Sequence, residues 1–342
     1  MVKPADFTAQ LEQKVAQQLK SQRVGYLIGA GSSYLNGDGY PLASEIWGII
    51  KDRISDEQKR DDIQTKLDQG ANGIEHALDL LDDGGADDTP YRHLVTEALA
   101  GALISKSPSL ASHGVFISRL AVRPDSCIKI FSLNYDPLIE RAAELQRVRL
   151  VDGFLGHEDA FFNAAVFSET FLIPRGPRAR PTMHPAGVPV HLYKLHGSLG
   201  WYECPERGPR RCGFSQTPPL GTARLMVPPN RRKASDVVRA PYSPIWTAFR
   251  AAMTQDAKPL HRLAAIGYGF GDEHVNDVLE AALDRSDFTL LIFTMALTDA
   301  AWNRWSSKSN TIVVTQERCS IKGSIGPGHS DLWSFERLAN EV

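Results

Sequence analysis

Short apolar runs, each followed at once by small or polar residues, constrain the fold of this chain most strongly. Each run is too short for a helix and is typical of a buried strand. Ligands of open α/β sheets bind beyond the carboxyl ends of such strands. A glycine turn, an Asn/Asp pair and a histidine at these ends therefore predict one site that acts on a nucleotide. The junctions are Val24–Ile28 before Gly29-Ala30-Gly31-Ser32-Ser33, Ile128–Leu133 before Asn134-Tyr135-Asp136, and Val190–Leu195 before His196-Gly197-Ser198.

The remaining pattern alternates strands with helices. Strands are predicted at Leu263–Ile266, Phe288–Phe293 and Thr311–Val314, with a helix at Val275–Leu283 between the first two. Such alternation predicts an α/β protein with a doubly wound, Rossmann-like, mostly parallel sheet covered on both faces. Further helices are predicted at about 4–22, from Pro41 to about 54 because proline suits a first helical turn, at 137–146, and at about 332–338.

Two long segments interrupt this alternation. Residues 57–122 contain no convincing strand, and their apolar spacing predicts a helical insertion after the first strand. Residues 151–240 predict a second, loop-rich insertion, in which Pro, Gly and Arg accumulate at 173–180 and 205–219. These arginine-bearing loops are expected at the surface, either simply solvated or in contact with phosphate or a partner protein. All of residues 1–342 are assigned to one catalytic domain.

Composition excludes several classes of protein. The net charge of −2 argues against strong direct nucleic-acid binding. No apolar run approaches the ~20 residues of a membrane span, and the amino terminus lacks the apolar core of a signal peptide. The four cysteines, Cys127, Cys204, Cys212 and Cys319, are too scattered for a disulfide framework. A reduced, cytoplasmic protein without a membrane partner is expected.

The glycine segment after the first strand admits two interpretations. Glycines at the start of a helix let backbone N–H groups approach a pyrophosphate, but a tight left-handed turn also requires glycine. The segment departs from G-x-G-x-x-G, because Ser32 and Ser33 precede any third glycine. Downstream, Gly37-Asp38-Gly39-Tyr40-Pro41 predicts a second, flexible loop suited to closing over a ligand.

The polar residues at the other strand ends also have structural alternatives. Asp136 is expected to cap a helix whose first residue is Pro137, which leaves Asn134 facing the pocket. A single histidine at a strand end, such as His196, is more often a structural hydrogen bonder than a catalyst, although the glycine after it permits close approach of a ligand. Asp272 follows Gly267-Tyr268-Gly269-Phe270-Gly271 and is expected to cap the next helix. Alternatively, the glycines of this loop let a ribose or adenine lie against its backbone.

Five motifs, taken in order, resemble the sirtuin superfamily over about residues 24–315. The resemblance implies NAD+ as ligand. The sequences Ser-Leu-Asn-Tyr-Asp and Lys-Leu-His-Gly-Ser most resemble the corresponding motifs of bacterial sirtuin-like proteins of antiviral defence. The motifs are Gly-Ala-Gly-x-Ser at 29–33, Gly39-Tyr40-Pro41, Asn134 with Asp136, His196-Gly197, and Gly-Tyr-x-Phe-x-Asp at 267–272.

By this resemblance, Gly29, Ala30, Gly31 and Ser32 hold the pyrophosphate. Asn134 and Asp136 orient the nicotinamide ribose and the attacking water, and His196 contacts the ribose hydroxyls and accepts a proton. The other residues assigned to binding NAD+ are Ser33, Tyr40, Pro41, Ser132, Gly267, Tyr268, Phe270 and Asp272.

One departure from the sirtuin deacylases decides the predicted activity. Their zinc ribbon carries two Cys-x-x-Cys pairs after His-Gly, whereas this chain has only Cys204 and Cys212 there, so no metal is expected. We predict an NAD+ glycohydrolase that acts in abortive infection. The alternatives are a non-catalytic sensor of NAD or ADP-ribose and an NAD-dependent protein deacylase. An uncontrolled NADase would kill its cell, so a homo-oligomer, or a complex with a separately encoded sensor or ATPase, is also expected.

Overall fold

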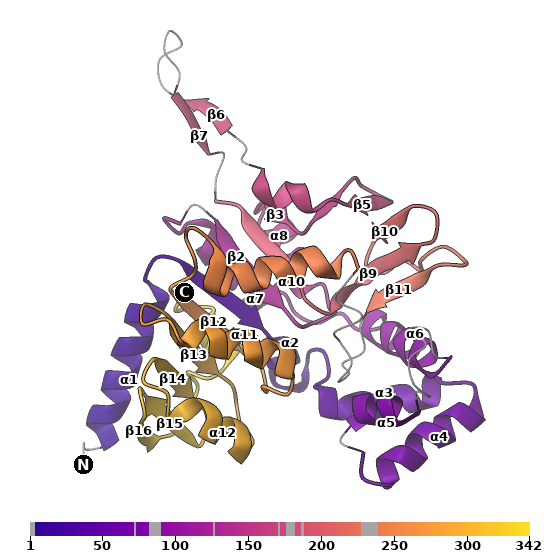
Figure 1. Ribbon diagram of the computed structural model, residues 1–342, viewed down its shortest axis with the longest axis horizontal. Helices are drawn as coiled ribbons and strands as arrows, with labels where there is room; N and C mark the ends of the chain where they lie inside the picture. The colour runs from indigo at the N-terminus through magenta and orange to yellow at the C-terminus, as the bar shows by residue number, and fades with distance from the viewer. Residues whose placement is uncertain are drawn as a thin grey trace.

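A nine-stranded sheet forms the centre of the molecule (Figure 1). The computed structural model describes residues 4–71, 73–81, 90–125, 127–169, 172–175, 182–185, 188–226 and 239–342. The strands of this sheet, in spatial order, are β16 (Ser324–Pro327), β15 (Arg318–Ile321), β14 (Thr311–Val314), β13 (Thr289–Phe293), β12 (Arg262–Ile266), β1 (Val24–Ile28), β2 (Ile128–Ser132), β8 (Val190–Lys194) and β3 (Leu150–Val151).

The order of the strands confirms the predicted doubly wound fold. The strands from β14 to β3 are parallel, and antiparallel pairing is found only between β14 and β15 and between β15 and β16 among the described strands of this sheet. The chain builds β1, β2 and β8 outward in one direction and then β12, β13 and β14 in the other. The order reverses between β1 and β12, and ligands of such sheets bind at this switch point.

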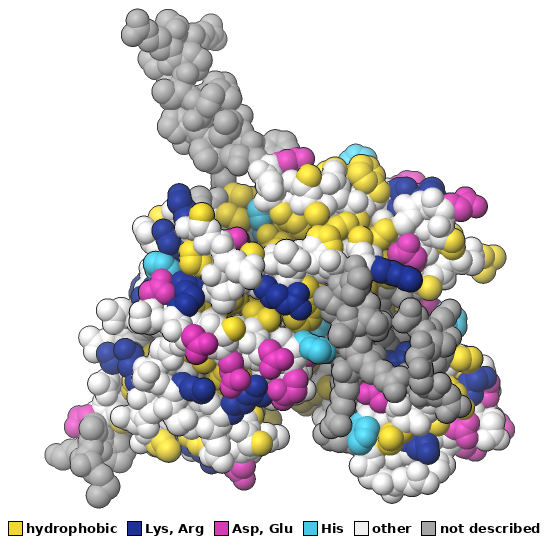
Figure 2. Space-filling model, viewed as in Figure 1, with side chains coloured by type: hydrophobic (Ala, Val, Ile, Leu, Met, Phe, Trp, Pro, Cys, Tyr) yellow, Lys and Arg dark blue, Asp and Glu magenta, His cyan; other side chains and the backbone are white. Residues whose placement is uncertain are grey.

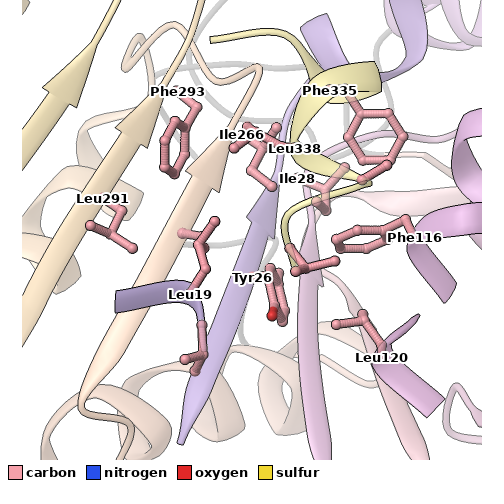
Figure 3. Packing of buried hydrophobic residues seen from close by; sticks show 14 of the residues in the cluster. Leu19, Tyr26, Ile28, Phe116, Leu120, Ile266, Leu291, Phe293, Phe335 and Leu338 are labelled. Carbon is pink, nitrogen blue, oxygen red and sulfur yellow. The ribbon is translucent and has the colours of Figure 1, made fainter. Parts of the chain in front are cut away.

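Helices cover both faces of the sheet. On one face, Tyr26 and Ile28 of β1 pack with Phe116 and Phe335, and the rings of Tyr26 and Phe116 meet edge to face at 5.2 Å (Figure 3). On the other face, Leu27 belongs to a second buried cluster. Strands that are buried on both faces have continuous apolar sequences, and for this reason the strands could be predicted from the sequence. The helices of the first face are α1 (Pro4–Leu19), α7 (Ala111–Ala121), α8 (Leu138–Leu145) and α13 (Phe335–Leu338), and those of the second are α10 (Tyr242–Arg250), α11 (Glu273–Leu283) and α12 (Asp299–Ser306).

The described part of the segment 57–122 is helical, as predicted, and contains no strand. With α3, its first three helices enclose a third buried cluster beside the sheet (Figure 1), while α7 returns to the sheet. The helix predicted from Pro41 begins later, because Leu42 is extended and its N–H bonds the Glu45 carboxylate at 2.9 Å. Helical turns at 43–45 and 51–53 flank α3. The helices are α3 (Ile46–Ile50), α4 (Glu57–Asp68), α5 (Gly73–Leu81) and α6 (Pro90–Ile104).

A small antiparallel sheet lies in the segment predicted to be loop-rich. The prediction of loops at 205–219 is wrong at β10 (Gly208–Arg211), which is a half-buried strand of this sheet. Its Arg211 pairs with Asp152, and Arg224, whose side chain is 4% exposed, pairs with Glu97 of α6 at 3.1 Å. The predicted loop 173–180 lies partly outside the described residues. The sheet order is β11 (Ala223–Met226), β9 (Gly197–Cys204), β10 (Gly208–Arg211), β5 (Ala160–Phe162) and β4 (Phe154–Leu155), with a separate hairpin of β6 (Leu172–Arg175) and β7 (Thr182–Pro185).

The surface seen in Figure 2 mixes charges of both signs. Over α11 and α12, acidic and basic side chains are interspersed rather than gathered into one basic patch (Figure 2), and Arg304 pairs with both Glu273 and Glu280. Among the described helices, none is long and apolar enough to cross a membrane.

Candidate active site

Four loops leave the carboxyl ends of neighbouring strands and are joined by hydrogen bonds. They follow β1, β2, β8 and β12, the strands on either side of the switch point. They contain the glycine segment 29–33, the Asn-Tyr-Asp segment 134–136, His196 and the segment 267–272. The predicted site residues of all four loops therefore lie at one edge of the sheet.

The glycines after β1 allow two loops to touch. A Cβ atom at Gly29 would lie 2.6 Å from the Gly267 carbonyl oxygen, and one at Gly31 would lie 2.8 Å from the Gly267 Cα. The Gly31 N–H donates to the same carbonyl at 2.8 Å. Gly267 itself has a φ of +65°, which favours glycine. Close backbone approach, rather than a left-handed turn at Gly29 or Gly31, therefore explains these two residues.

Little of the glycine segment faces solvent. Gly31 is exposed and Ala30 half-buried, whereas Gly29, Ser32 and Ser33 are buried. The N–H groups of Ser32 and Ser33 bond back to the carbonyls of Gly29 and Ala30 at 3.0 Å each, in the short helix α2 (Gly31–Tyr34). Any ligand of this loop would thus meet mainly Ala30 and Gly31.

The loop that carries Tyr40 is packed down, which corrects the prediction of a flexible closing loop. Tyr40 is 4% exposed and belongs to the core of the helices α3 to α6, and this burial raises the pKa of its phenol to about 12. Its N–H bonds the Ser33 carbonyl at 2.8 Å, and Lys106 Nζ donates to the Gly39 carbonyl at 2.8 Å. Pro41 is half-buried.

Asn134 links the loops after β1 and β2. Its Nδ2 donates to the Gly29 carbonyl at 3.0 Å and to the Ser33 hydroxyl at 2.9 Å. Its own N–H bonds the hydroxyl of Ser132 at 3.1 Å. Because a carbonyl oxygen only accepts, the amide nitrogen must face Gly29. Within the described ranges no hydrogen bond reaches its Oδ1.

Asp136 caps the helix after β2, and the helix begins one residue later than predicted. The helix begins at Leu138, and Pro137 occupies the N-cap position with no side-chain bond of its own. The Asp136 carboxylate accepts the N–H of Leu138 at 3.0 Å. The predicted capping role is therefore confirmed, while Pro137 as first helical residue is wrong.

A buried ion pair lies beneath this loop. Lys194 is 1% exposed, and its ammonium donates to the Asp136 carbonyl and, at 3.0 Å, to the carboxylate of Glu140. Burial raises the pKa of Glu140, and Lys194 opposes that shift. A buried charge of this kind requires its partner, so the pair fixes the backbone at Asp136 to the end of β8.

His196 contacts Asp272 across the edge of the sheet. Its Nε2 lies 2.9 Å from Asp272 Oδ2, and the two side chains are 8% and 9% exposed. Asp272 also caps α11, as predicted, by accepting the N–H of His274 at 3.1 Å. Its assignment as a residue that touches a ligand stays a prediction.

Tyr268 and Phe270 point into the protein. They are 7% and 5% exposed, their ring centroids lie 4.6 Å apart, and Phe270 packs on Trp305 at 5.1 Å. The intervening Gly269 is exposed, and nothing lies within 4 Å of a Cβ placed there. Within this loop, ligand contact through exposed backbone fits the structure better than contact through the two aromatic rings.

The cysteines of the small sheet do not lie side by side. Cys204 pairs in register with Gly208, whereas the N–H of Cys212 bonds the Gly200 carbonyl at 2.9 Å. Four residues of strand, about 13 Å, separate the two positions. Among the residues that the structure describes, no three His, Cys, Asp or Glu side chains are grouped as metal ligands.

Comparison with protein families decides the relationship of this chain. The family model of the SIR2-like domain matches residues 128–311, more than half of the 342 residues. The chain belongs to the SIR2-like family. The matched region of this SIR2-like protein includes Asn134, Asp136, His196 and Asp272, while the glycine segment precedes it. No curated protein matches the sequence.

Solved structures of Sir2 homologues are similar at low sequence identity. A complex of a Sir2 homologue with NAD is 14% identical, with a TM-score of 0.46 and 84% of each chain covered. A mutant Sir2 homologue with ADP-ribose is 12% identical, with a TM-score of 0.49 and 96% and 95% covered. Sir2Tm bound to a propionylated peptide is 11% identical, with a TM-score of 0.43 and 97% of each chain covered.

Two features of the site were not predicted from the sequence. The ion pair of Lys194 with Glu140 and the contact of His196 with Asp272 both join distant segments. Lys194, which directly precedes Leu195 at the end of the strand-like run, is a signal that could have indicated a buried partner, since a lysine buried without one is very costly. No local signal in the sequence indicates which carboxylate faces His196.

Proposed function

We propose that this SIR2-like protein hydrolyses NAD+ to nicotinamide and ADP-ribose. The observation that carries the proposal is the single hydrogen-bonded network of four loops at the switch point of the sheet. In it, Asn134 is anchored to the glycine segment, His196 to Asp272, and Gly31 to Gly267. An amide oxygen and an imidazole are thus held at the edge where a doubly wound sheet binds nucleotides.

The chemistry needs few groups. Nicotinamide leaves as a neutral molecule when the bond to ribose C1′ breaks, and positive charge develops on the ribose. Water then adds its oxygen to C1′ and loses one proton. Preorganised dipoles near the developing charge lower the barrier, and a positioned base takes the proton. We assign the orientation of this water to the Oδ1 of Asn134, together with Asp136, and contact with the ribose hydroxyls and proton acceptance to His196.

Binding of NAD+ is assigned to the accessible parts of the same loops. Ala30 and Gly31 are the residues of the glycine segment open to solvent, so the pyrophosphate is proposed to lie against their backbone. Gly29, Ser32 and Ser33 support that backbone from within. The exposed backbone at Gly269 and Gly271 is proposed to accommodate the ribose or adenine.

Variants of two histidines test the assignment. His196→Ala is expected to abolish nicotinamide release while the protein stays folded, with a lower unfolding temperature because the buried Asp272 carboxylate loses its hydrogen bond with His196. His157→Ala, at an exposed position, serves as the matched control and should keep full turnover. Near wild-type turnover by His196→Ala would show that the assigned role is wrong. Binding of ADP-ribose without any turnover in the wild type would support a sensor instead.

The biological role is proposed from the resemblance of the Asn134 and His196 motifs to antiviral sirtuin-like proteins. We propose that NAD+ depletion by this chain stops phage growth, and that assembly controls it, through a homo-oligomer or a separately encoded partner. Contacts are expected on the helices of 57–122 and on the arginine-bearing segments 173–180 and 205–219. Turnover of the chain alone and with the protein encoded by a neighbouring gene, measured with light scattering, tests this control. Full activity from a clean monomer would contradict it.

A further inference from the structure

The segment between β12 and α11 holds one carboxylate in a fixed place. The Tyr268 hydroxyl accepts a hydrogen bond from the N–H of Asp272 at 3.0 Å and donates one to the Asp272 carbonyl oxygen at 3.1 Å. Asn276 Nδ2 donates to the Phe270 carbonyl at 3.0 Å, and Phe270 itself has a φ of +60°. A left-handed backbone conformation is strained for a residue other than glycine and persists only where its surroundings enforce it. The loop is therefore built around a defined position of Asp272.

This carboxylate reaches a histidine that belongs to a distant strand. His196 follows β8 and Asp272 follows β12, with β2 and β1 lying between them. Neighbouring strands are about 4.8 Å apart, so the two strand ends are separated by about 14 Å. The contact of 2.9 Å between His196 Nε2 and Asp272 Oδ2 closes that distance. The pair thus connects the two sides of the site.

We propose that Asp272 is a positioning residue that selects the reactive tautomer of His196, an inference that rests on the proposed hydrolysis of NAD+. An ionised carboxylate only accepts hydrogen bonds. A neutral His196 ring facing it must therefore keep its proton on Nε2 and its lone pair on Nδ1. When Nδ1 takes a proton during the reaction, the same carboxylate stabilises the resulting imidazolium.

Helix capping alone would also explain an aspartate at this position, and one substitution separates the two roles. Asparagine caps helices about as well as aspartate, so Asp272→Asn should retain the cap on His274 and the melting temperature. Its amide can donate to Nε2, which favours the wrong tautomer. We expect kcat to fall by about 100-fold or more, as a misdirected tautomer does in other histidine enzymes, with KM for NAD+ changed less than about threefold.

Asp56→Asn is the matched control, because Asp56 caps α4 by accepting the Lys59 N–H at 3.1 Å. It should leave kcat unchanged. If Asp272→Asn keeps the wild-type kcat, or if it unfolds while Asp56→Asn does not, the positioning role is overturned.

A spectroscopic measurement tests the pair without relying on activity. Nitrogen NMR of ring-labelled histidine reports which nitrogen carries the proton, and His196→Ala identifies the His196 signal. The wild type should show the Nε2–H tautomer, and Asp272→Asn a change toward Nδ1–H. An unchanged tautomer in Asp272→Asn overturns the proposal. If the tautomer differs between the wild type and Asp272→Asn as expected but the wild type never cleaves NAD+, the proposed hydrolysis is wrong and the positioning of His196 by Asp272 stands.

Discussion

Replacing Asn134 with alanine removes two contributions of this side chain at once. Its Nδ2 donates to the Gly29 carbonyl at 3.0 Å and to the Ser33 hydroxyl at 2.9 Å, and the residue is only 9% exposed. A buried hydrogen bond contributes about 1 kcal/mol, so Asn134→Ala should lower the free energy of unfolding by about 2 kcal/mol. The truncation also removes Oδ1, and turnover of NAD+ should fall by about 100-fold or more.

Asn310→Ala is the matched control for the loss of stability. Asn310 Nδ2 donates to the Leu283 carbonyl at 2.8 Å, and the residue precedes β14 at the edge of the sheet opposite the site. Its truncation should cost about 1 kcal/mol and leave turnover unchanged. Urea unfolding measures the first quantity, and nicotinamide release at saturating NAD+ measures the second.

The comparison of these two variants can refute the role of Asn134. Equal losses of turnover in Asn134→Ala and Asn310→Ala would show that activity follows stability alone. Wild-type turnover in Asn134→Ala would remove Oδ1 from the mechanism. An unchanged unfolding free energy for Asn134→Ala would show that its bonds to Gly29 and Ser33 contribute nothing.

Three further predictions concern stability and metal content. Burial lowers the pKa of His113 from 6.5 to about 4 in the folded state. As the pH falls from 6.5 toward 4, His113 is protonated in the unfolded state but not yet in the folded state, so the free energy of unfolding decreases. His113→Phe should remove roughly 3 kcal/mol of this acid dependence, as measured from unfolding curves at pH 7 and pH 4. Asp136→Ala should lose activity and, with its cap on Leu138, about 1 kcal/mol; an unchanged melting temperature would contradict the cap. Elemental analysis should find no stoichiometric zinc, whereas one zinc per chain that is lost in Cys204→Ser would restore the deacylase alternative.

The parallel sheet could be predicted because its signal is local. The run 24–28 and the run 311–314 match β1 and β14 at both ends, since strands buried on both faces are apolar throughout. The antiparallel strands 208–211 and 223–226 could not be predicted in this way. Arg211 and Arg224 in these strands pair with Asp152 and Glu97 from other segments, and the sequence pattern does not reveal such pairing.

The site was predicted as a set of residues rather than as a set of contacts. The caps by Asp136 and Asp272 follow from sequence neighbours and could be predicted. Tyr40 was expected above a ligand, because its neighbouring glycines suggest mobility, yet the helices inserted after β1 bury it. The contact of His196 with Asp272 joins residues 76 positions apart, and only the folded sheet brings them together.

The most direct test of the central claim is the product balance of the wild-type chain. The protein, purified with any partner that accompanies it, is incubated with NAD+ and no acylated peptide, and products are quantified by mass spectrometry. We predict nicotinamide and ADP-ribose in equal amounts, and neither product from His196→Ala. Nicotinamide release that requires an acylated peptide, or NAD+ that stays intact in every preparation, would contradict the account.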